Sequence, residues 1–250
     1  MNTGLLTTAR WHLLQHPSDF PWGEDITDEL IDLIGNKLGF PAPSTPQETL
    51  IPIAPLPPKG TGHCIALVVG HARPVDEGNV GAGGVSEEEY NLPLVRKVAG
   101  RLEARGIKVI VITYIPANDY EPAMRWLAKH LLDNKATAAI EFHFNDFDGK
   151  AKGHEVLHWE RSKRGITLAE SVLESIDRKF PWHLSRGLKA KTSRDRGALF
   201  LSLTHCPACI CEPFFGDNPA EWNQFDDFDE VERLADAYAE GIFAWIKANP

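Results

Sequence analysis

Residues 66–94 read ALVVGHARPVDEGNVGAGGVSEEEYNLPL. The apolar run 66–69 has the composition of a buried strand, and the chain then reaches a histidine, His71, after a single glycine. A glycine-rich loop follows, and Ser86 then precedes three glutamates. Ser86 with Glu89 three residues later forms a capping box, which predicts that a helix begins here. The stretch therefore predicts a strand, a loop and a helix, the unit from which parallel sheets are built.

Strands and helices alternate along the rest of the chain after residue 60. Short apolar runs predict strands, and longer segments with apolar side chains three to four residues apart predict helices. The predicted elements are strands at 64–70, 107–115, 136–145 and 154–159, helices at 86–106, 121–134, 165–180 and 221–247, and short apolar runs at 198–203 and 208–215. This alternation predicts an α/β fold, a mostly parallel twisted sheet with helices on both faces. In open sheets of this kind, active sites lie outside the carboxyl ends of the strands.

The N-terminal region differs in composition from the rest of the chain. Residues 41–60 are so rich in proline that neither a helix nor a central strand can run through them, so they are predicted to be a linker. Residues 1–40 are predicted to form a small helical segment or module, because apolar side chains recur at helical spacing between Asp25 and Gly39. This segment is either a structural appendage or a separate binding module, and residues 61–250 form the main domain.

Composition excludes several classes of protein. The 250 residues are 43% hydrophobic, which suffices to bury the core of one α/β domain without disulfides. A formal net charge of −9 argues against a nucleic-acid partner. The basic stretch 188–196 (LKAKTSRDR) is interpreted as a solvated loop. No apolar stretch approaches the roughly 20 residues that a membrane span needs, and the first residues show no export signal.

The four cysteines raise the question of a zinc site. The segment 206–212 reads CPACICE and contains the C-x-x-C spacing of metal ligands, but the chain has no second such cluster. Cys209 and Cys211 alternate within an apolar run, as two side chains on one face of a strand would. Free thiols are therefore predicted.

Three predicted strands end in side chains that an apolar core does not accommodate: His71, His143 and Glu212. If the strands are parallel, these groups meet at one edge of the sheet. A buried carboxylate must shift its pKa, find a partner or bind a metal. Two histidines and one carboxylate leave one position of a tetrahedral Zn²⁺ open, as in catalytic zinc sites. The third ligand is expected from the glutamates at 87–89, among which the residues alone do not discriminate.

The chain resembles a known family over residues 62–250: the zinc-dependent N-acetylmuramoyl-L-alanine amidases, which hydrolyse bacterial cell walls. The resemblance lies in a Gly-His loop, a helix-opening glutamate, a strand with His-x-Asn, the segment after it, and a late glutamate. The corresponding segments here are VVGH (68–71), GAGGVSEEEYNLPL (81–94), AIEFHFND (139–146), GHEVLHW (153–159) and ACICEPFFGDN (208–218).

The resemblance implies a set of functional residues. His71, Glu87 and His143 would hold Zn²⁺, with Glu87 selected by its spacing from the Tyr-Asn-Leu that follows. Glu212 would be the catalytic residue, taking a proton from the attacking water and delivering it to the departing amine. The scissile bond would be the amide between N-acetylmuramic acid and L-alanine of peptidoglycan.

The sequence also departs from the family pattern. The family usually has an aspartate before Gly-His and a glycine after it, whereas here Arg73 and Pro74 lengthen the loop, which leaves open the role of Asp76. His154 and His158 are extra imidazoles near the site, interpreted as structural or substrate-facing. Trp159, Trp182, Arg194 and Arg196 are candidate residues of a substrate groove.

The absence of an export signal suits a phage or prophage endolysin, cytoplasmic before its release to the cell wall. One alternative is a zinc carboxypeptidase or an N-acyl amino acid deacylase of related architecture, although the segment HARP at 71–74 lacks the His-x-x-Glu of such carboxypeptidases. A further alternative is a peptidoglycan-binding protein without catalytic activity. Peptidoglycan is the expected partner, with no nucleic acid and no membrane, and no oligomeric state is predicted.

Overall fold

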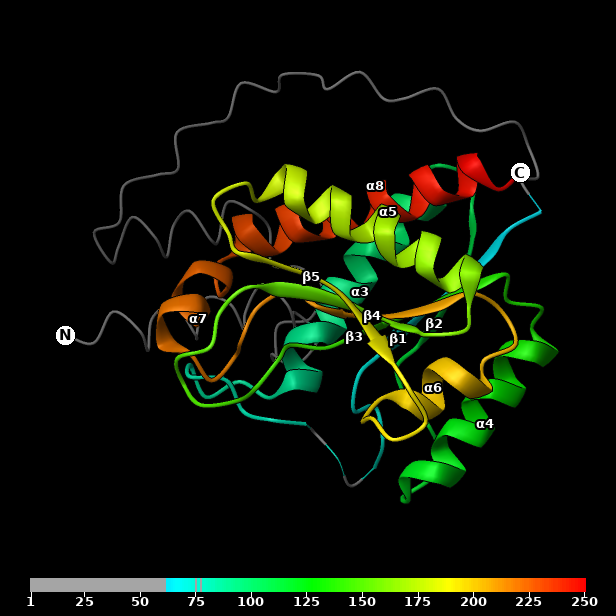
Figure 1. Ribbon diagram of the computed structural model, residues 1–250, viewed down its shortest axis with the longest axis horizontal. Helices are drawn as coiled ribbons and strands as arrows, with labels where there is room; N and C mark the ends of the chain where they lie inside the picture. The colour runs from blue at the N-terminus through cyan, green and yellow to red at the C-terminus, as the bar shows by residue number, and fades with distance from the viewer. Residues whose placement is uncertain (1–61, 75, 77) are drawn as a thin grey trace, which may run out of the picture. The chain divides into compact units, whose positions relative to one another are not determined.

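A computed structural model describes residues 62–74, 76 and 78–250 (Figure 1). The predicted helical segment 1–40 and the linker 41–60 lie outside the described residues, as does residue 61. The strands are β1 (Cys64–Val69), β2 (Lys108–Ile112), β3 (Ala138–Phe142), β4 (His154–Trp159), β5 (Ser185–Lys191) and β6 (Ala208–Glu212). The helices are α3 (Glu87–Glu103), α4 (Tyr120–Asp133), α5 (Lys163–Lys179), α6 (Ala198–Leu203), α7 (Pro219–Phe225) and α8 (Phe228–Ala248).

The six strands form one sheet in the order β2-β1-β3-β6-β4-β5. All neighbouring strands are parallel except β4 and β6, which are antiparallel. The predicted α/β fold with a mostly parallel sheet is confirmed. Because β1, β3 and β6 are adjacent and parallel, their carboxyl ends lie at the same edge of the sheet.

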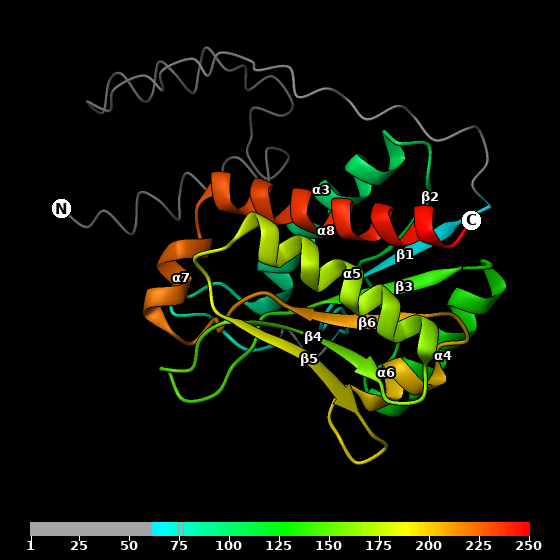
Figure 2. The same ribbon diagram turned by 45° about the horizontal axis from the view of Figure 1, so that its top comes forward.

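Helices cover both faces of the sheet (Figures 1 and 2). On one face α3 contacts β1 and β2, α5 contacts β4, β5 and β6, and α8 packs across α3 and α5. On the other face α4 and α6 pack together, and α6 contacts β4 and β6. The core beneath α4 and α6 contains Val68, Ala139 and Ile210, which come from the three central strands. Both faces of β1 are buried, which explains why its sequence is continuously apolar.

The start of α3 follows the sequence prediction. Ser86 has an extended backbone and its side chain accepts a hydrogen bond from the backbone N–H of Glu89 at 3.2 Å. This bond satisfies one of the N–H groups that a helix leaves unpaired at its start. The helix that carries the glutamate triplet is therefore fixed at its first turn by a local interaction.

Two predictions about secondary structure were wrong. The helix expected at 221–247 is two helices, because Asp227 accepts a hydrogen bond from the N–H of Glu230 at 2.9 Å and caps a new helix. The basic stretch 188–196 is not all loop, since its first four residues belong to β5, which pairs with β4. This strand lies at the edge of the sheet and is partly exposed, so its sequence lacks the apolar pattern of the buried strands.

The other sequence-level interpretations concern membranes and thiols. None of the helices in the described part of the chain is long and apolar enough to cross a membrane. All four cysteines are free thiols, as predicted, and three of them are buried. Cys209 and Cys211 lie on the central strand β6, where they are fully buried.

Candidate metal centre

The candidate site lies at the carboxyl edge of the three central strands. His71 follows β1 by two residues, His143 follows β3 directly, and Glu212 is the last residue of β6. The backbone holds these ends in register, because Gly70 donates its N–H to Phe142 O at 2.9 Å and His143 donates to Cys211 O at 3.0 Å. The structure therefore brings together the strand-end groups that the sequence placed there.

Three of the predicted residues form a compact group of potential metal ligands. His71, Glu87 and His143 each offer one ligand atom, and these atoms lie within 4.8 Å of one another. His143 Nδ1 is 2.7 Å from Glu87 Oε1, and His71 Nε2 is 3.3 Å from Glu87 Oε2. Within the described residues this is the one group of at least three such side chains close enough to hold an ion.

Glu87 is the member of the glutamate triplet that faces the site. Its side chain is only 2% exposed, because it is the first residue of α3 and points at the strand ends. Its two carboxylate oxygens also accept hydrogen bonds from backbone N–H groups, one from Phe144 at 3.2 Å and one from Asn79 at 3.3 Å. Together with the two imidazole contacts, these two hydrogen bonds hold the carboxylate in one orientation between the imidazoles.

Glycines allow the loop after β1 to close around these side chains. Gly78 has a φ of +75°, and a Cβ at this position would lie 2.7 Å from Glu87 Cβ and 2.8 Å from His71 Cδ2. Only a residue without a side chain fits this turn against both. His71 itself adopts a φ of 59°, an unusual backbone conformation for a residue other than glycine. Such strain is common at functional sites.

Each imidazole has a carboxylate at the ring nitrogen that faces away from Glu87. His71 Nδ1 lies 2.9 Å from Asp76 Oδ1, so Asp76 contacts the imidazole despite the lengthened loop. His143 Nε2 lies 3.5 Å from Glu141 Oε2. Glu141 was missed in the sequence, although a carboxylate inside the apolar run AAIEF was a signal that could have found it.

The electrostatics of the group follow from these contacts. Burial opposes the charge of Glu87, but hydrogen bonds from His143 and His71 outweigh it and lower the pKa of the carboxyl to about 2. Burial likewise opposes the charge of His143, but Glu141 and Glu87 raise its pKa well above the usual value. The site therefore stabilises positive charge between its carboxylates, which is the property that a cation site needs.

Glu212 differs from Glu87 in its surroundings. Burial raises the pKa of its carboxyl to about 8, against the opposing effect of His143 and with a further increase from Glu87. Its Oε2 atom is buried and has no hydrogen-bond partner among the described residues. A carboxyl group with a pKa near neutrality can both accept and release a proton at working pH.

The residues present fit a zinc ion. Two imidazole nitrogens and one carboxylate oxygen are a catalytic zinc donor set, which leaves a fourth position open. Ligands about 2.0–2.2 Å from one tetrahedral ion are about 3.4 Å apart. The 3.3 Å between His71 Nε2 and Glu87 Oε2 agrees with that spacing, whereas the 2.7 Å between His143 Nδ1 and Glu87 Oε1 is a hydrogen-bond distance that would lengthen on metal binding.

The other candidate residues lie outside this group. The Nε2 atom of His154 lies 2.7 Å from Asp177, and His158 Nδ1 contacts Trp159 O, so both are held by structural partners. Trp182 is exposed, and Arg196 is close enough to influence the pKa of Asp146, which follows the His-x-Asn segment.

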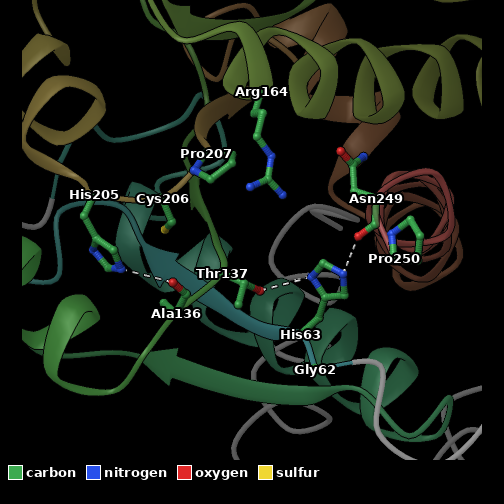
Figure 3. Close-up of a pocket in the computed structure, with 10 residues that line it drawn as sticks. All are labelled: Gly62, His63, Ala136, Thr137, Arg164, His205, Cys206, Pro207, Asn249 and Pro250. Atoms are coloured by element: carbon green, nitrogen blue, oxygen red, sulfur yellow. Dashed lines mark hydrogen bonds between the residues drawn. The ribbon is translucent and has the colours of Figure 1, made fainter.

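A separate cavity lies at the opposite edge of the sheet. It has a volume of about 450 Å³ and is lined by residues that precede β1, β3 and β6, among them Thr137 and His205 (Figure 3). Arg164 reaches into it from the start of α5, and His63 is hydrogen-bonded to Thr137 and Asn249. This cavity contains none of the strand-end residues of the candidate metal centre.

Comparison with known families gives one match. The profile of the N-acetylmuramoyl-L-alanine amidase family matches residues 65–244. This range includes all four strand-end and helix-start residues of the candidate site. A comparison with curated proteins found no match.

Solved structures of amidases have a similar fold. The N-acetylmuramoyl-L-alanine amidase AmiC2 of Nostoc punctiforme is 22% identical with a TM-score of 0.65, over 76% of this chain and 99% of that one. The CwlD amidase from Clostridioides difficile, solved in complex with the GerS lipoprotein, is 19% identical with a TM-score of 0.67, over 75% of this chain and 100% of that one. The catalytic domain of the CD27L endolysin, described as targeting Clostridia Difficile, is 24% identical with a TM-score of 0.61, over 73% of this chain and 97% of that one.

Proposed function

Because the chain belongs to the N-acetylmuramoyl-L-alanine amidase family over residues 65–244, we propose that it is a zinc-dependent peptidoglycan amidase. The bond cleaved is the amide between N-acetylmuramic acid and L-alanine of the stem peptide. His71, Glu87 and His143 hold the zinc ion, and Glu212 is the catalytic acid and base. Membership of the family supports the amidase activity, and the donor set supports the metal.

One observation carries this proposal. Three potential ligands from distant parts of the chain, His71, Glu87 and His143, place their ligand atoms within 4.8 Å of one another. Two imidazoles and a carboxylate gathered in a buried site are the donor set of a catalytic zinc ion. When bound, zinc polarises the scissile carbonyl and makes water a better nucleophile.

Glu212 transfers the proton from the attacking water to the departing amine. Its backbone lies beside that of His143, since the N–H of His143 pairs with the carbonyl of Cys211, and His143 is near enough to oppose the rise in the pKa of the Glu212 carboxyl. As a carboxylate it accepts a proton from the attacking water, and as a carboxylic acid it returns that proton to the departing amine of L-alanine. Burial, which raises its pKa to about 8, makes the carboxylate form a stronger base toward the water.

The test compares bound zinc and the release of stem peptides from purified peptidoglycan for three variants. Glu212→Gln is expected to retain zinc and to lose about 100- to 10,000-fold in turnover, the usual contribution of a general acid and base. His143→Ala is expected to lose both zinc and activity. Glu103→Gln, at an exposed carboxylate at the far end of α3, is the control and should match the wild type.

The products distinguish this function from its rivals. Newly exposed amino groups of L-alanine support the amidase. Cleavage confined to small N-acyl amino acids would identify a deacylase, and release of C-terminal amino acids a carboxypeptidase. Wall binding without any release would identify a binding protein, and equal turnover by wild type and Glu212→Gln would exclude Glu212 as acid and base.

We further propose the biological role of a phage or prophage endolysin, cytoplasmic until its release to the cell wall. The likeness to the catalytic domain of an endolysin supports this role. Fractionation of the native host before lysis tests it: the protein should remain in the cytoplasmic fraction, and its accumulation in the medium of intact cells would contradict the role. Purified protein added to peptidoglycan suspensions should lower their turbidity.

A further inference from the structure

A carboxylate lies in the apolar centre of the sheet, where nothing in the fold requires one. Glu141 belongs to β3, and its register partners are Val68 on β1 and Ile210 on β6, both buried and apolar. Its side chain is only 8% exposed. A buried carboxylate without a cation is strongly unfavourable, so the position must be retained for an interaction.

That interaction is with a residue of the candidate metal centre. Glu141 Oε2 lies 3.5 Å from His143 Nε2, two residues further along the same side of the chain. Among the described residues, no lysine or arginine forms an ion pair with Glu141, whose one such partner is His143. The opposite ring nitrogen, His143 Nδ1, lies 2.7 Å from Glu87 Oε1. The imidazole is therefore held between two carboxylates.

We propose that Glu141 is a positioning residue for His143, which fixes the ring so that Nδ1 faces the metal. This inference rests on the proposed zinc function. A neutral imidazole has one N–H and one lone pair, and an ionised carboxylate can only accept a hydrogen bond. With one proton directed at Glu141, Nε2 is the donor. Nδ1 shares its own proton with Glu87 in the metal-free protein, and when zinc replaces that proton the Nδ1 lone pair is already directed at the metal.

His71 has the same kind of carboxylate partner, but its two ring nitrogens have exchanged roles. His71 directs Nδ1 to Asp76 at 2.9 Å, which leaves Nε2 for the metal. Metal-binding histidines generally have such partners, whose loss lowers metal affinity by about 10- to 100-fold. Asp76 comes from the loop after β1, whereas Glu141 comes from inside the sheet, so the two carboxylates orient the rings independently.

The positioning role and a purely structural role predict different behaviour for Glu141→Leu. Leucine matches the apolar register partners Val68 and Ile210, and replacing a buried charged group by an apolar one is often neutral or stabilising for the fold. The metal-free Leu variant is therefore expected to unfold at the wild-type temperature or above it. Its zinc dissociation constant is expected to rise by about 10- to 100-fold. A residue that merely stabilised the fold would give the opposite pattern.

The experiment measures zinc affinity by competition with a chelator, together with thermal unfolding of the metal-free protein. Glu141→Gln keeps the shape of the side chain and removes its charge, so it should also weaken zinc binding, and it decides the question if the Leu variant does not fold. Thr137→Val is the control, because it alters partly buried polar contacts just before the other end of the same strand. Its zinc affinity should equal that of the wild type.

A second measurement monitors the Nε2 proton of the His143 ring. In the zinc-loaded wild type, the Nε2 proton of His143 should be observable by NMR and protected from exchange, and in Glu141→Leu it should exchange faster. Wild-type zinc affinity in both Glu141 variants would overturn the inference while leaving the proposed function intact. A wild-type protein that bound no zinc would overturn both.

Discussion

The turn at Gly78 provides a test of how closely the loop is fitted to the candidate ligands. In Gly78→Ala, the added Cβ would lie 2.7 Å from Glu87 Cβ, whereas carbon atoms in favourable contact are about 3.5–4.0 Å apart. Glu87 or the loop must therefore move by about 1 Å, a displacement that costs about 100-fold in rate at an active site. The φ of +75° adds about 1–2 kcal/mol of backbone strain. For a domain of this size, that strain lowers the melting temperature by about 2–8 °C.

Gly106→Ala separates the two effects. Gly106 has nearly the same φ, +76°, but a Cβ there would meet no atom within 4 Å. Both variants should therefore lose stability from backbone strain, measured by thermal unfolding of the metal-free proteins, and Gly78→Ala should lose more because its Cβ also clashes with Glu87 and His71. Only Gly78→Ala should also lose zinc affinity and peptidoglycan turnover. If the two variants bound zinc equally well and had equal turnover, the reasoning about the loop would be refuted.

Three further changes test other parts of the structure. Burial lowers the pKa of His154, so the unfolded chain binds a proton at this imidazole more tightly than the folded protein does. The free energy of unfolding should therefore fall as the pH drops below the unfolded pKa of about 6.5. In urea titrations at several pH values, this fall should be smaller for His154→Asn than for the wild type. Trp222→Ala removes the ring that Gly81 and Gly83 pack against and should cost about 3–5 kcal/mol in urea unfolding; a cost below about 1 kcal/mol would contradict the packing. Asp76→Asn should weaken zinc binding by about 10- to 100-fold in chelator competition, and unchanged affinity would show that Asp76 does not orient His71.

Local rules of sequence explain which parts of the fold could be predicted. The run 64–69 is apolar on both faces because β1 is buried on both. Ser86 caps α3 through a contact three residues away, so the helix start could be read directly from the sequence. The edge strand β5 escaped prediction because half-exposed residues carry no strong apolar pattern, and the break before α8 depends on one capping aspartate.

The candidate site was predictable to the extent that it depends on the ends of strands. The order of parallel strands places His71, His143 and Glu212 at one edge, and the residues alone supported that placement. The residues alone did not discriminate among the glutamates at 87–89; the spacing to Tyr-Asn-Leu in the family pattern selected Glu87. In the structure the rotation of α3 about its axis turns Glu87 toward the imidazoles.

The sequence by itself determined the local elements, the alternation that makes a parallel sheet, and the chemical types that collect at its edge. Only the tertiary structure brought the Glu87 carboxylate between the imidazoles and showed which carboxylates, Asp76 and Glu141, lie behind them. Hydrophobic patterning and capping act between residues close in the chain, so a sequence displays them. The direction of a side chain across the sheet depends on how distant elements pack, and that is settled only when the whole core is assembled.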